Sequence, residues 1–215
     1  MTDHSAEPTT DDAVRAGVAA HNVGEYDLAR GIWAGETPLA AADDQPPLRS
    51  GLAAFATAVF DGRRGNWDAA LAAAEEARSA LADAGSGSVQ PADVDIAPVR
   101  RWLAAFEADP EFAERSPPPT LIVDGDRPTP GELPLSAASL VATAVATGIG
   151  DDAEVLLDAV RFAEAHDQPE TTRYGTFIRD YAGAETGQRG IVFQRLSALV
   201  ERERRKEDDV SGLFG

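Results

Sequence analysis

The sequence predicts an all-α protein of antiparallel helical hairpins with one short β-hairpin insert. Apolar residues recur at steps of three and four through most of the 215-residue chain, and glycine or proline separates these runs. The exception is the β-prone stretch Thr120 to Val123, which precedes the turn dipeptide Asp124-Gly125. We therefore expect helices on both sides of a small hairpin.

The first fifty residues predict one helical hairpin. Residues 1–10 are polar and are expected to form a disordered tail, from which Thr9 or Thr10 caps a helix that runs to about His21. A second helix is expected from Glu25 and would bury an apolar stripe that ends at Trp33.

The stretch from Leu48 to Leu81 predicts the central hairpin, around which the rest of the chain is organised. Its first helix would turn Leu52, Phe55 and Val59 inward. Its second helix would place inward Trp67, Leu71 and Ala74, the last small enough for close helix approach.

The two hairpins share a repeated turn. Gly24-Glu25-Tyr26-Asp27-Leu28-Ala29 reappears as Gly65-Asn66-Trp67-Asp68-Ala69-Ala70, at an offset of 41 residues. In each copy, glycine supplies a left-handed residue and alanine permits close packing. The pattern resembles the tetratricopeptide-repeat hairpin, although its spacing exceeds the usual 34 residues. We therefore expect a tetratricopeptide-like bundle.

The remaining chain predicts a linker and a second helical region. Gly85-Ser86-Gly87-Ser88 follows a helix and not a strand, which favours a flexible connection over a phosphate-binding loop. A helix is expected from Pro98 to Ala108. Four more helices are expected at Ser136–Thr147, Asp152–His166, Thr171–Tyr181 and Gln188–Glu207.

The expected parts are an N-terminal domain (11–108), a linker carrying the hairpin (109–135), a helical region (136–207) and a loose tail (208–215).

Composition indicates a salt-adapted protein. The net charge is −18, and Lys206 is the only lysine among nineteen bases. A carboxylate-rich surface stays hydrated at molar salt, where charge repulsion is screened, so we expect a salt-in halophile. The acidity argues against a nucleic-acid binder. Because no apolar run of about 20 residues and no signal segment is present, we expect a cytoplasmic protein without membrane attachment.

The order of these parts resembles the helical family described as domain of unknown function 309. The resemblance covers about residues 13–84 and rests on the Gly24-Glu25-Tyr26 turn, Trp33, Gly51-Leu52 and the Gly65-Asn66 turn. In that family the second helix carries a His-Glu pair about three residues before the tryptophan, and this chain has Arg30-Gly31 there. The resemblance therefore implies a helical fold and a degenerate polar site, and the family has no settled activity to transfer.

No catalytic constellation stands out in the sequence. Of the three histidines, His4 lies in the tail, while His21 and His166 fall near predicted helix C-termini, where the helix dipole favours a positive imidazole. Nucleophile elbows, zinc helices and phosphate-binding loops are absent from the sequence. We assign no catalytic residue, metal ligand or cofactor, and we favour a non-catalytic protein over an enzyme.

Two groups of basic residues are candidate binding surfaces. One surrounds the first two hairpins, where the planar guanidinium groups of arginine lie near aromatic residues. Such groups suit the recognition of carboxylate or phosphate. Its members are Tyr26, Arg30, Trp33, Arg49, Arg63 and Arg64. The other is a docking patch for an acidic partner or for RNA, formed by Arg202, Arg204, Arg205 and Lys206. Pairing with nearby acids is the structural alternative for the first group, and the helix dipole is the alternative for the second.

These features favour an interaction or scaffold protein that binds a protein partner or another copy of itself. Helical hairpins offer concave surfaces for helices and peptides. The alternative is a small-molecule, anion or nucleotide-binding protein, which would use the arginine-aromatic groove between the first two hairpins.

Overall fold

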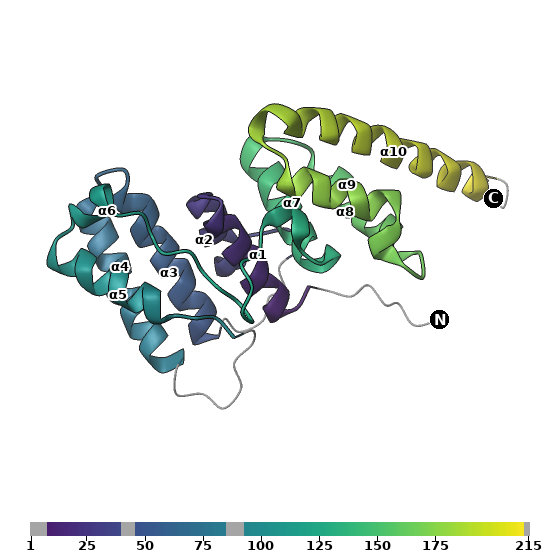
Figure 1. Ribbon diagram of the computed structural model, residues 1–215. Coiled ribbons are helices and arrows are strands. Elements are labelled where there is room, and N and C mark those ends of the chain that lie inside the picture. The colour runs from purple at the N-terminus through teal and green to yellow at the C-terminus, as the bar shows by residue number, and fades with distance from the viewer. Residues whose placement is uncertain (1–7, 40–45, 85–92, 213–215) are drawn as a thin grey trace.

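The computed structural model describes residues 8–39, 46–84 and 93–212 and confirms the all-α class (Figure 1). Within these ranges the α-helices are α1 (Thr10–Asn22), α2 (Tyr26–Ala34), α3 (Pro47–Gly62), α4 (Trp67–Ala84), α5 (Ala97–Ala108), α6 (Phe112–Arg115), α7 (Leu135–Ile149), α8 (Ala153–Glu164), α9 (Arg173–Gly183) and α10 (Thr186–Gly212). Two 3-10 turns, η1 (Pro130–Glu132) and η2 (Pro169–Thr171), precede α7 and α9, respectively. No helix in the described part of the chain is both long and apolar enough to cross a membrane.

Helices α1 to α5 pack in chain order, each against the next. Gly24 and Gly65, the repeated turn glycines, have φ values of 87° and 76°, as the repeat predicts. Two other glycines permit close contact between helices. A Cβ on Gly17 would lie 2.3 Å from Trp33 Nε1, and one on Gly51 would lie 2.7 Å from Leu81 Cγ. The two predicted hairpins thus form one continuous stack.

The connection from α6 to α7 runs back along the stack and is fixed by the end of α1 (Figure 1). Asn22 Nδ2 donates to Leu121 O at 3.0 Å, and Asn22 Oδ1 accepts from Leu121 N at 2.8 Å. The adjacent ring of His21 contacts Pro119 O through Nε2 at 3.0 Å. Two neighbouring side chains therefore satisfy backbone groups almost one hundred residues away in sequence.

The predicted β-hairpin was wrong, although its turn forms. Asp124 and Gly125 both have positive φ, and Val123 and Asp126 exchange two backbone hydrogen bonds of 3.0 Å. Val123 makes a further isolated bridge to Val94, and no strand occurs within residues 8–39, 46–84 and 93–212. Proline explains this result, because residues 117–119 and 128 lack the N–H groups needed to extend a ladder.

Helix α7 joins the two halves of the molecule. It packs against α1 and α2 on one side and against α8 and α9 on the other. Most of its side chains are buried, including Leu140, Val141 and Ala142. These residues belong to the same apolar cluster as Trp33, Phe55 and Leu103 in the stack. The described residues therefore share one core, and α7 packs against the first hairpin within it.

The ends of the chain differ in part from the predicted tails. Thr9 and Asp12 form a reciprocal capping box at the start of α1, which confirms Thr9 as the cap. At the other end, α10 begins two residues before the predicted start and continues through residues 208–212, which were expected to be loose. Residues 1–7, 213–215 and the Gly85–Ser88 connection lie outside the described ranges.

Candidate functional site

Three of the six groove residues lie at the turn end of the two hairpins. The guanidinium carbon of Arg63 lies 5.6 Å from the centroid of the Tyr26 ring, which links the end of α3 to the start of α2. The guanidinium carbon of Arg64 lies 5.0 Å from the centroid of the Phe60 ring. Both distances are in the range of cation–π attraction. Neither arginine forms an ion pair with another described residue.

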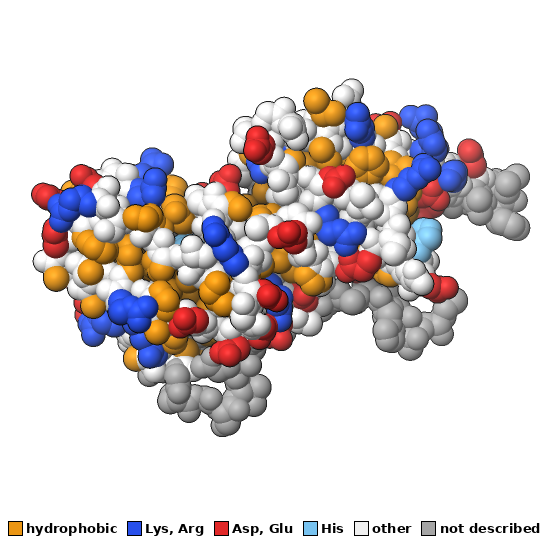
Figure 2. Space-filling model, in the orientation of Figure 1, with side chains coloured by type: hydrophobic (Ala, Val, Ile, Leu, Met, Phe, Trp, Pro, Cys, Tyr) orange, Lys and Arg blue, Asp and Glu red, His pale blue; other side chains and the backbone are white. Residues whose placement is uncertain are grey.

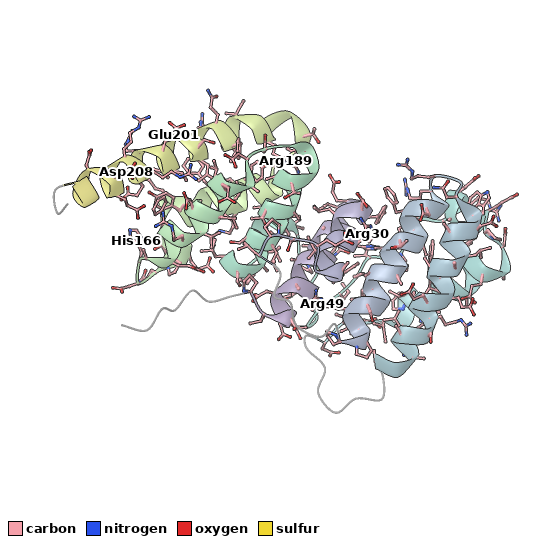
Figure 3. All side chains as sticks on the ribbon, turned by 180° about the vertical axis from the view of Figure 1, so that it is seen from behind. Arg30, Arg49, His166, Arg189, Glu201 and Asp208 are labelled. Atoms are coloured by element: carbon pink, nitrogen blue, oxygen red, sulfur yellow. The ribbon has the colours of Figure 1, made fainter. Side chains whose placement is uncertain are left out.

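The other three groove residues have different surroundings, and Figure 3 labels two of them, Arg30 and Arg49. Arg30 is held on the helix surface by Asp27 and Glu36 at 3.1 Å each. Trp33 is fully buried, and its Nε1 donates to Val14 O at 3.3 Å. Arg49 is 4% exposed and donates through Nε to Trp33 O at 3.0 Å. Burial lowers the pKa of Arg49. The structure thus brings Tyr26 and Arg63 together. The charge of Arg30 is balanced by two carboxylates, and Trp33 is part of the core.

His21 lies beneath this turn end and is a neutral structural residue. It packs edge-on to Tyr26, with ring centroids 5.1 Å apart, and beside Phe55 at 5.3 Å. Because Pro119 O can only accept, Nε2 carries the proton and Nδ1 is left without a hydrogen-bond partner. Burial lowers the pKa of His21 to about 4, despite the opposing effect of the Pro119 contact. The expectation of a positive imidazole stabilised by the helix dipole was therefore wrong here.

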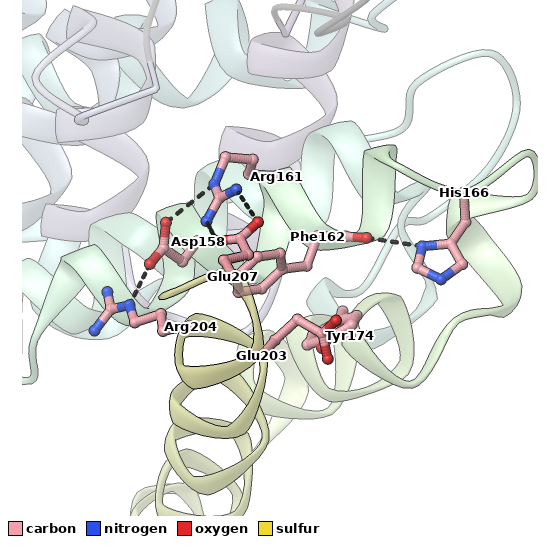
Figure 4. A network of polar contacts seen from close by, with 8 residues as sticks. All are labelled: Asp158, Arg161, Phe162, His166, Tyr174, Glu203, Arg204 and Glu207. Atoms are coloured by element: carbon pink, nitrogen blue, oxygen red, sulfur yellow. Dashed lines mark hydrogen bonds and ion pairs between the residues drawn. The ribbon is translucent and has the colours of Figure 1, made fainter. Parts of the chain in front are cut away.

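The inner side of α10 is fixed to α8 and α9 by apolar and ionic contacts. Leu196 and Val200 are fully buried. Beyond Val200 the contacts are polar, as Figure 4 shows. Arg204 pairs with Asp158 of α8, while Arg161 of α8 contacts Glu207 through two hydrogen bonds of 2.8 and 3.0 Å. The bond with Arg161 lowers the pKa of Glu207.

Members of the predicted docking patch therefore have different roles. Arg204 anchors the helix, whereas Arg205 and Lys206 pair with Glu201 and Glu203 of the same helix at 3.2 and 2.8 Å. Arg202 is exposed and forms no ion pair with another described residue. Basic side chains gather over the C-terminal part of α10 (Figure 2).

Sequence reasoning missed a stripe on the outer side of α10, which we call the α10 outer face. Its members follow one another at steps of four, three, four and three residues, and all are exposed. They are Ile191, Arg195, Ala198, Arg202 and Arg205. Ile191 is 56% exposed. The same spacing rule that found the inner stripe would have found this face, had the outer positions been counted as well.

A metal centre is not apparent in the described part of the chain, where no three His, Asp or Glu side chains form a group that could hold an ion. His166 Nδ1 lies 2.9 Å from Phe162 O, a contact within its own helix end (Figure 4). Comparison with known proteins found no family model, curated protein or solved structure that matches the chain.

Proposed function

We propose that this protein is a non-catalytic helical interaction protein of a salt-adapted cytoplasm and that it binds its partner through the α10 outer face. Kinship with the domain of unknown function 309 family is part of this proposal and rests on the repeated turns together with Trp33 and Gly51-Leu52. The halophilic setting rests on the net charge of −18.

One observation carries the interaction role. Residues 186–206 hold six basic and two acidic residues, in a chain that is otherwise strongly acidic. Two of these bases, Arg195 and Arg202, are exposed on the outer face and have no acidic partner in the described part of the chain. The guanidinium group of arginine binds carboxylates through paired N–H donors. A basic stripe on a firmly anchored helix suits an acidic protein surface.

Charge reversal on this face tests the proposal. We expect R195E/R202E to lose a protein that the wild type captures from native lysate, because two attractive contacts become repulsive. The matched control is R101E/R127E, which makes the same charge change at two exposed arginines outside α10. Mass spectrometry of both captures gives the readout. Equal recovery of every captured protein by R195E/R202E and wild type would contradict the proposal.

A second candidate function is the binding of an anion or nucleotide at the turn end. The stacking of Arg63 on Tyr26 favours it, because a guanidinium held by an aromatic face keeps its N–H edge free for phosphate or carboxylate. The same captures test this candidate if their small molecules are also analysed. An anion retained by wild type and R195E/R202E but lost by R63Q/R64Q would favour this function over the first.

A further inference from the structure

We propose that the α10 outer face docks on the outer side of α4 in a second copy of this chain. The inference rests on the proposed function, since it names the partner of the same surface. It follows from two exposed helix faces that match in charge, spacing and side-chain size.

The outer side of α4 carries acidic and small side chains. Asp68, Ala72, Glu75 and Ser79 follow one another at steps of four, three and four residues, and all are exposed. We call this stripe the α4 outer face. Neither Asp68 nor Glu75 forms an ion pair with another described residue. A shallow hollow lies along the stripe, lined by Ala72, Glu75, Glu76, Ser79 and Ala80.

The charges of the two faces are spaced alike. Asp68 and Glu75 are seven residues apart on α4, as are Arg195 and Arg202 on α10. At 1.5 Å per residue each pair spans about 10 Å, so two helices side by side can form both Arg–carboxylate pairs at once. A small alanine lies between the charges on each helix, Ala72 on α4 and Ala198 on α10. Small residues at these positions allow the helices to approach closely.

The position of the faces determines the kind of assembly. Helices α4 and α10 lie toward opposite ends of the molecule (Figure 1). Contact between two different faces is heterologous, and it extends into a ring or an open chain of copies. The expected product is therefore a concentration-dependent series of oligomers.

A charge exchange between the two faces tests the inference by sedimentation analysis of the full-length protein. R195E/R202E makes both faces acidic, and D68R/E75R makes both faces basic. We expect the wild type to self-associate and each variant alone to associate at least about tenfold more weakly. An equimolar mixture should associate again, because each face then meets its opposite charge.

The controls separate a charge effect from misfolding. R101E/R127E should associate as the wild type does, and circular dichroism checks that every variant is folded. E75R alone replaces D68R/E75R if arginine at position 68 disturbs the first turn of α4. A wild type that stays monomeric, a variant that associates unaided, or a mixture that stays monomeric would overturn the inference. If R195E/R202E still loses a different captured protein, the proposed function stands without self-association.

Discussion

Replacing Trp33 by alanine is expected to reduce the free energy of unfolding by about 3–5 kcal/mol, the loss typical of a large aromatic residue removed from a core. The Trp33 side chain is fully buried and lies against Gly17 of α1. The mutation removes these packing contacts and the hydrogen bond to Val14 O. Denaturant unfolding of the two proteins, with equal slopes, gives the difference directly.

Trp67 provides the matched control, since it follows the second turn glycine and is only half-buried. Trp67→Ala should cost less, about 1–2 kcal/mol, because part of its surface is already in water in the folded state. A second control starts from Gly17→Ala, whose new methyl would overlap the Trp33 pyrrole ring. Its cost should fall when Trp33→Phe removes that ring. Equal losses for the two tryptophans would contradict the assignment of Trp33 to the core.

Acidification is expected to cost the wild type about 3 kcal/mol more than His21→Gln between pH 6.5 and pH 4. The pKa of His21 falls from 6.5 to about 4 on folding because the ring is buried. Within that window the unfolded chain binds a proton that the folded chain does not, so stability falls as the pH falls. Each pKa unit corresponds to about 1.4 kcal/mol.

Glutamine serves here because its amide can still donate to Pro119 O while it does not titrate. Carboxylates titrate in both proteins, so the difference between the two stability curves isolates His21. Urea unfolding of both proteins at several pH values measures this difference in stability. Parallel curves across the window would show that the imidazole is not buried in the neutral form.

The helical part of the fold was predictable because it depends on local periodicity and caps. The repeated turns predicted the positions of Gly24 and Gly65 correctly, and Thr9, the observed cap, was one of the two threonines predicted to cap the helix before Asp11 and Asp12. Helix α6 has four residues, too few for a periodic pattern to be recognised. The β-hairpin failed for another reason, because the turn signal is local whereas strand pairing depends on donors that the flanking prolines lack.

The site was less predictable because its properties depend on distant parts of the chain. Nothing near His21 in sequence indicates that Pro119 meets its ring or that the pKa falls. Likewise, Arg204 could not be separated from Arg202 by sequence, since only the position of Asp158 decides which arginine is an anchor. The α10 outer face was available from spacing alone, but its significance depends on knowing which side of the helix is covered.

Site-specific photocrosslinking from the α10 outer face tests the central proposal most directly. A photoreactive amino acid at position 198 replaces an exposed alanine between Arg195 and Arg202, and position 104 offers an exposed alanine on α5 as the control. In native lysate we expect a discrete protein adduct from position 198 and none from position 104. No adduct at position 198, or the same adducts at both positions, would contradict α10 as the binding surface.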